Sequence, residues 1–370
     1  MFMHSQFTSQ GSCSEHFFSV CAKPGKNFAG EAESLLEEYH EAIAGAGCSV
    51  DSEFLLRFHC SDIVNQKPIL KKLLGDRPSF VSMIGQPPAD LSRVALEAWH
   101  ILPMKKRVLR EQSVCFEFSN YRFLLFEGTD SDIKGSFDQT AREFAELSSE
   151  LAGLQGNIAD HTVRTWLYCR DVDNNYAGLV QARNRFFDSI GLTSKTHFIA
   201  STGIEGISAK PSRLVTMDSL NIPGLDPNQM RYLSAPEMLS PTTIYNVRFE
   251  RGTRLVLGDR SHYYISGTAS IDKNGKVLFP DDVRNQTCRL LDNVEALMRS
   301  SEGSLEDLKQ ATVYMRDIAD VPVIREELEK RLPAGIPMVL VKAPVCRPAW
   351  LVEMETIGIN AKGGDFPPLA

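Results

Sequence analysis

The chain has 370 residues, with 40 basic against 47 acidic side chains and a formal net charge of −7. Hydrophobic residues make up 43% and charged residues 24%, which is typical of a soluble globular protein of two or three packed units and far from disordered, fibrous or membrane-spanning chains. The acidic balance argues against a protein that binds nucleic acid by neutralising phosphates.

The start of the chain lacks a basic region followed by an apolar segment, and no apolar run approaches the roughly 20 residues that a membrane span needs. The eight cysteines contain no C-x-x-C pair and no Cys/His cluster with zinc spacing, so we expect reduced, packed thiols. Phosphate-binding loops and the H-E-x-x-H motif are also absent from the sequence. We therefore expect a cytoplasmic protein without a metal or nucleotide cofactor.

One pattern recurs three times along the chain: an amphipathic helix, a short polar stretch, a β-rich run that ends in Asp, and a second helix. In the first copy the pattern predicts a helix over 31–44, a β-rich run over 54–62, a helix over 64–74, and β-rich runs over 80–84 and 94–101. Most of the hairpin that leads into the first helix is missing from this copy.

The second and third copies repeat this order and add the entering strand. The second copy comprises 123–129, 137–154, 163–171, 175–190, 197–202 and 213–217. The third copy comprises 263–268, 283–298, 311–317, 321–332, 338–343 and 350–357. The β-rich runs of the three copies end at Asp62, Asp171 and Asp317. These residues are 109 (171 − 62) and 146 (317 − 171) positions apart, so each copy has the size of a domain.

Strands followed by two helices and closing strands predict an α+β fold, with helices on one face of a mixed sheet. Three equivalent units can cover the other faces of their sheets by packing around a three-fold axis. We expect an intrachain pseudo-trimer with a degenerate unit at 1–108, a second unit at 109–222 and the best-preserved unit at 223–370. We expect this pseudo-trimer to be a monomer or a low-order homo-oligomer.

The third copy resembles the RidA (YjgF) family over roughly residues 255–358. The matching segments are 265–270 (ISGTAS), 303–307 (GSLED), 312–317 (TVYMRD) and 352–355 (VEME). The family's proteins are small trimers with sites between subunits, which implies sites between the units of this chain. RidA deaminases hold a substrate carboxylate with an Arg in the closing strands, and this sequence has Pro337 and Met338 there.

A second resemblance, to the chorismatases, extends from about residue 160 to 358. Those enzymes share the RidA-type fold and hydrolyse the enol ether of chorismate. The similar segments are 163–168, 183–187, 201–206, 226–229, 266–271 and 345–353. The chain departs from the chorismatase pattern at Leu167, where that family has Asn, and at Asn184, where it has Tyr.

The chorismatase resemblance implies that Glu353 is the catalytic acid, because a carboxyl in a desolvated cleft keeps its proton at neutral pH. Residues alternate between the two faces of a strand, so Glu353 and Glu355 share one face of the segment 352–355. If that face is exposed, Glu353 is a solvent-facing strand residue instead of a catalytic acid. Arg347 is a candidate carboxylate clamp or an edge-strand charge.

The other candidates for substrate binding lie on matching segments of the second and third copies. They are Arg164, Tyr168, Arg183, Thr202, Gly203, Gly267, Thr268 and Cys346. Arg164 and Tyr168 alternate on a strand, and a packed sheet face is their alternative role. The two glycines indicate a close approach of the backbone to a ligand or a simple bulge. Cys346 has no His near it in sequence and is not expected to be a nucleophile.

The resemblances imply a small-molecule hydrolase or lyase that acts on a carboxylated metabolite by general acid/base catalysis. An imine or enamine deaminase of the RidA kind is the alternative enzyme. A non-catalytic metabolite-binding protein, of the type also labelled translation initiation inhibitor or endoribonuclease, is the alternative from another class.

Overall fold

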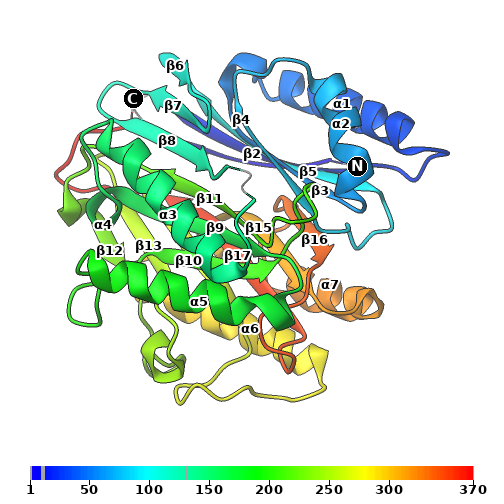
Figure 1. Cartoon of the computed structure of the whole chain (residues 1–370). Coiled ribbons are helices and arrows are strands. Elements are labelled where there is room, and N and C mark those ends of the chain that lie inside the picture. Colours follow the sequence, from blue (N-terminus) through cyan, green and yellow to red (C-terminus); the bar gives the residue numbers. More distant parts are fainter. Residues whose placement is uncertain (1, 10–12, 130–131, 370) are drawn as a thin grey trace.

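The computed structural model describes residues 2–9, 13–129 and 132–369. Within these residues the chain forms three sheets that follow one another in sequence (Figure 1). The helix pairs lie at the periphery and the sheets face one another at the centre (Figure 1). The predicted α+β fold of three tandem units is confirmed.

The first sheet has the order β1-β2-β5-β3-β4. Its strands are β1 (Phe2–Thr8), β2 (Ser14–Cys21), β3 (Glu53–Cys60), β4 (Phe80–Gly85) and β5 (Val94–Leu102). Helices α1 (Phe28–Gly45) and α2 (Ile63–Leu74) pack on it, and α2 joins the parallel pair β3 and β4.

The second sheet has the order β10-β9-β11-β8-β7-β6. Its strands are β6 (Lys106–Leu109), β7 (Ser113–Glu117), β8 (Arg122–Glu127), β9 (Thr162–Cys169), β10 (Ala200–Glu205) and β11 (Val215–Asn221). Its helices are α3 (Ser136–Ala152), the short α4 (Ile158–His161) and α5 (Val172–Ser189). Strand β6 lies across the predicted boundary between residues 108 and 109, and the unit boundaries stay a prediction.

The third sheet has the order β12-β13-β14-β17-β15-β16. Its strands are β12 (Met230–Tyr232), β13 (Gly252–Val256), β14 (Ser261–Ala269), β15 (Leu308–Met315), β16 (Met338–Lys342) and β17 (Val352–Asn360). Helices α6 (Val283–Arg299) and α7 (Val321–Glu329) cover it. Each sheet thus contains the same arrangement: a hairpin, the closing strand, and a parallel pair at the opposite edge.

The first unit contains the entering hairpin that the sequence analysis expected to be mostly missing. Strands β1 and β2 pair along their whole length, and β2 pairs with β5. The expectation is wrong because Phe17, Phe18 and Val20 are all buried. A strand that is covered on both faces does not alternate between apolar and polar residues. The two-residue alternation by which a half-exposed strand is predicted is therefore absent from its sequence.

The units meet in cyclic order. Strand β4 of the first unit contacts β8 of the second, β10 of the second contacts β14 of the third, and β16 of the third contacts β2 of the first. Each contact joins the outer strand of a parallel pair to the hairpin of the next unit. This closed cycle is the arrangement that a three-fold pseudo-axis requires.

Three buried carboxylates occupy equivalent places near the centre of this arrangement. Glu97, Asp218 and Glu355 lie opposite Arg57, Trp166 and Thr312 on the neighbouring strand of their own sheets. The Arg57 guanidinium lies 3.9, 3.6 and 3.9 Å from the three carboxylates, in that order. One cation from the first unit therefore bridges acids of all three units.

Candidate functional site

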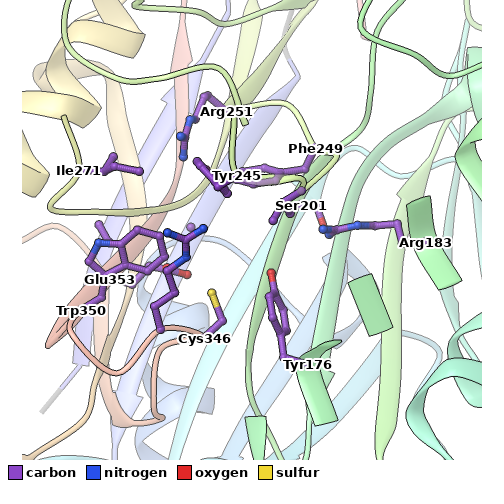
Figure 2. A pocket seen from close by; sticks show the side chains of 15 residues that line it. Tyr176, Arg183, Ser201, Tyr245, Phe249, Arg251, Ile271, Cys346, Trp350 and Glu353 are labelled. Atoms are coloured by element: carbon purple, nitrogen blue, oxygen red, sulfur yellow. The ribbon is translucent and has the colours of Figure 1, made fainter. Parts of the chain in front are cut away.

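A cavity lies between the second and third units, where β10 contacts β14. Figure 2 shows the side chains that line this cavity. Its volume is about 40 Å³, which leaves room for only a few water molecules. The residues that line it are Tyr176, Arg183, Ser201, Gly203, Tyr245, Val247, Phe249, Arg251, Gly267, Ala269, Ile271, Cys346, Arg347, Trp350 and Glu353. Because both units contribute to the wall, neither unit contains this site alone.

Glu353 on β17 points its carboxyl into the wall of this cavity and is only 5% exposed. The carboxyl packs against the backbone of Gly267, where a β-carbon would lie 2.1 Å from Oε1 of Glu353. The close approach requires glycine at this position. Burial, and next the charge of Glu355, raise the pKa of Glu353 from 4.5 to about 8, although Arg251 and Arg164 oppose the rise. The group therefore holds a transferable proton at neutral pH.

The acid is specific to the third unit. Glu97, Asp218 and Glu355 are equivalent in register, so the positions equivalent to Glu353 lie two residues earlier on β5 and β11. These positions are Ala95 and Thr216. The two other inter-unit clefts consequently lack a carboxyl at the corresponding place on the closing strand.

Three guanidinium groups surround the cavity, and no acidic side chain among the described residues pairs with them. Arg183 on α5 is 1% exposed, and its Nε and Nη2 have no hydrogen-bond partner. Arg251 donates from Nη2 to the carbonyl of Ser240 at 3.0 Å, while its Nε is unpartnered. Burying a cation without an anion is costly, so a negatively charged ligand would match the charge of this cavity.

The third guanidinium, that of Arg347, lies between two aromatic rings. Its central carbon is 4.4 Å from the ring centre of Tyr245 and 4.9 Å from that of Trp350. Cation–π contacts on both sides hold the side chain at the rim of the cavity. Figure 2 shows Tyr245 and Arg251 above the cavity, with Glu353, Trp350 and Cys346 below them.

Tyr176, which lies on α5, and Cys346 form one part of the cavity wall. A β-carbon at residue 203 would lie 2.8 Å from the Tyr176 ring, so Gly203 makes room for this tyrosine. Burial, and next the charge of Glu353, raise the pKa of Cys346 to about 12. Burial raises the pKa of Tyr176 well above its usual value. Both groups stay protonated at neutral pH, and Cys346 is therefore not poised as a nucleophile.

The structure brings six of the ten predicted site residues together around the cavity: Glu353, Arg183, Arg347, Gly203, Gly267 and Cys346. The other four, Arg164, Tyr168, Thr202 and Thr268, do not line it. Thr268 donates to the carbonyl of Ser266, and Tyr168 lies near Arg57 at the centre of the molecule. Thr268 lies between Gly267 and Ala269, which both line the cavity, so its side chain points to the other face of β14.

Sequence reasoning missed nine of the lining residues. They are Tyr176, Ser201, Tyr245, Val247, Phe249, Arg251, Ala269, Ile271 and Trp350. Four of them lie within the segments that resemble the known families, and this position could have identified them as site residues: Ser201, Ala269, Ile271 and Trp350. Tyr245 ends a short 3-10 helix, Thr242–Tyr245, and Phe249 and Arg251 follow it in the connection between β12 and β13. A helix of four residues is too short to show a helical period in the sequence.

The comparison with known families matches the third unit. The profile of the family described as Endoribonuclease L-PSP matches residues 254–360. The third unit belongs to the RidA superfamily. The match ends at Asn360, the last residue of β17. Gly267 and Glu353 both lie within the matched residues, so this RidA-type unit contributes them to the cavity.

Among solved structures, a chorismatase is similar over most of the chain. The two share 19% identity with a TM-score of 0.65, covering 83% of this chain and 93% of that one. The chain thus has the fold of that chorismatase.

Two single-unit proteins also match. A putative endoribonuclease from Thermotoga maritima is 20% identical, with a TM-score of 0.30, over 36% of this chain and 98% of its own. RidA from the Antarctic bacterium Psychrobacter is 20% identical, with a TM-score of 0.29, over 35% and 98%.

Among the described residues, no group of three or more His, Cys, Asp or Glu side chains could hold a metal ion. The eight cysteines are all free thiols. No helix within the described ranges combines the length and apolarity needed to cross a membrane.

Proposed function

We propose that the chain is a hydrolase or lyase that acts on a small carboxylated metabolite, with Glu353 as the general acid. The observation that carries the proposal is a buried carboxyl with a raised pKa in a cavity bordered by three guanidinium groups without acidic partners. A general acid at neutral pH needs such a carboxyl, and an anionic substrate supplies the charge that the arginines lack.

The chemistry that fits this arrangement is the chorismatase-like cleavage of an enol ether. Glu353 gives its proton to the terminal enol carbon, and the π electrons of the double bond form the new C–H bond. Water then adds to the ether carbon and loses a proton to the Glu353 carboxylate, which restores the acid and leaves a hemiketal. The ether C–O bond of the hemiketal breaks with its electron pair passing to the leaving oxygen. That oxygen takes up the hydroxyl proton of the hemiketal, and the products are an alcohol and a carbonyl compound. Arg183, Arg251 and Arg347 hold the substrate carboxylates, because guanidinium binds carboxylate in a bidentate manner.

The test is a substrate screen that begins with chorismate and small imino acids, followed by single-turnover kinetics of variants. Glu353→Gln removes the proton and preserves the size of the side chain, so turnover should fall by about 10²- to 10⁴-fold while binding survives. Arg347→Ala should mainly weaken affinity. Glu306→Gln, on the surface of the same unit, is the control and should behave as the wild type.

The pH dependence adds a second readout. Since the active form of Glu353 is protonated and its pKa is about 8, turnover should fall as the pH rises above this value. Wild-type turnover in Glu353→Gln would refute the assignment. Turnover of imino acids but not of enol ethers would favour the deaminase, and calorimetric binding of a carboxylate without any turnover would favour the non-catalytic alternative.

A further inference from the structure

Behind the cavity wall, a buried arginine of the second unit connects three polar groups. Arg164 on β9 is 2% exposed. Its Nη2 donates to Oε2 of Glu355 at 2.8 Å and also to the hydroxyl of Thr202, and its Nη1 donates to the hydroxyl of Ser266 at 3.3 Å. With its head group occupied, Arg164 is not free to bind substrate.

The same network continues to the backbone on which Glu353 rests. The hydroxyl of Thr202 accepts a hydrogen bond from the backbone N–H of Gly267 at 2.9 Å. Gly267 is the residue against which the Glu353 carboxyl packs. Arg164 thus fixes Thr202 in the second unit, and Thr202 fixes the Gly267 backbone in the third.

The second carboxylate oxygen of Glu355 is also held by a hydrogen bond. Its Oε1 accepts from the indole N–H of Trp166 at 2.7 Å, and Arg57 lies 3.9 Å away. Because residues two apart on a strand share a face, Glu355 brings a negative charge beside Glu353. Its own oxygens are already taken by the second unit.

We propose that Arg164 and Glu355 are positioning residues for Glu353: they hold its carboxyl in place from behind the cavity wall and act on it with opposite charges. This inference rests on the proposed function and gives Arg164 a different role from the substrate clamp that the sequence suggested. The remaining ionisable groups around Glu353 are Arg251, Arg183, Arg347, Tyr176 and Cys346.

Removing either charge is expected to shift the pKa of Glu353, and the two shifts should have opposite signs. Glu355→Gln removes a like charge and leaves Arg164 unopposed, so the pKa of Glu353 should fall by about one pH unit or more. Arg164→Gln removes an opposite charge, so that pKa should rise. The double variant removes both charges and should bring the pKa back near the wild-type value. A purely structural role would not produce shifts of opposite sign.

The readout is the titration of the Glu353 carboxyl by ¹³C NMR in the full chain labelled at the glutamate δ-carbons, without substrate. The signal is assigned by its loss in Glu353→Gln. Glu143→Gln is the matched control, because Glu143 forms another buried ion pair, with Arg213 at 2.9 Å, in the second unit. It should destabilise the fold and leave the Glu353 titration unchanged.

Arg164→Lys keeps the charge but loses the forked hydrogen bonds to Glu355, Thr202 and Ser266. It should leave the pKa of Glu353 near the wild-type value and lower kcat more than it raises KM. Shifts of the same sign in Glu355→Gln and Arg164→Gln, or no shift in either, would overturn the proposal. Opposite shifts in a protein that turns over no enol ether would support the positioning pair and reject the proposed reaction.

Discussion

Gly267 determines how closely the backbone approaches the Glu353 carboxyl. In Gly267→Ala the new methyl group would lie 2.1 Å from Oε1 of Glu353 and 3.0 Å from the Thr202 methyl, so the carboxyl must move. A displacement near 1 Å costs about 10²-fold in rate, and we expect that loss in single-turnover measurements. Gly45→Ala, where the methyl group meets no atom within 4 Å, should keep wild-type turnover.

The buried Glu353 also makes stability depend on pH. Its pKa is 4.5 in the unfolded chain and about 8 in the folded one, so between these values the folded state binds more protons. Unfolding free energy therefore falls as the pH rises through this window, by up to ~1.4 kcal/mol per pH unit. In Glu353→Gln the decline should be smaller. Urea unfolding at pH 5 and pH 8.5 checks this, and parallel curves for the two proteins would contradict it.

At the scale of elements, the connection between β12 and β13 covers the cavity. The carbonyl of Asn246 accepts from the Asn184 side chain at 3.0 Å, and Arg248 donates to the carbonyl of Asn184 at 2.9 Å and pairs with Asp188. These contacts fasten residues 241–250 to α5 of the second unit. Beyond Tyr245 lies an outer chamber of about 630 Å³.

The inner cavity, at about 40 Å³, is far smaller than the ~300 Å³ or more typical of small-molecule sites. A substrate must therefore move residues 241–250 or the Arg347 side chain to enter. Arg248→Ala removes the contacts with Asp188 and Asn184, so amide hydrogen exchange over 241–250 should become severalfold faster. Mass spectrometry measures this rate. Arg185→Ala, on an exposed part of α5, should leave it unchanged.

At the scale of the whole molecule, Arg57 joins the three units. Arg57→Met leaves Glu97, Asp218 and Glu355 buried without their shared cation, and removing one member of a buried ionic cluster costs about 3–5 kcal/mol. We expect a destabilisation of that size in urea unfolding. Arg142→Met, which removes an exposed i,i+4 pair with Glu146, should cost no more than about 0.5 kcal/mol.

The sequence by itself determined the repeat and much of the candidate site. Residues at helical spacing, such as Leu35, Tyr39 and Ile43, are buried in α1 as their period requires. The resemblance of the segments around Gly267 and Glu353 to known families indicated the third unit and made Glu353 the candidate acid. Strand β2 of the entering hairpin in the first unit escaped detection because both of its faces are covered.

Only the tertiary structure decided which strand faces meet. Arg164 and Arg183 both come from segments that resemble a substrate site, yet Arg183 lines the cavity and Arg164 lies behind its wall. Arg251 joins the site from a connection without periodicity. The difference depends on contacts between units that are far apart in the chain, such as Arg164 with Glu355, and no local pattern in the sequence encodes such contacts.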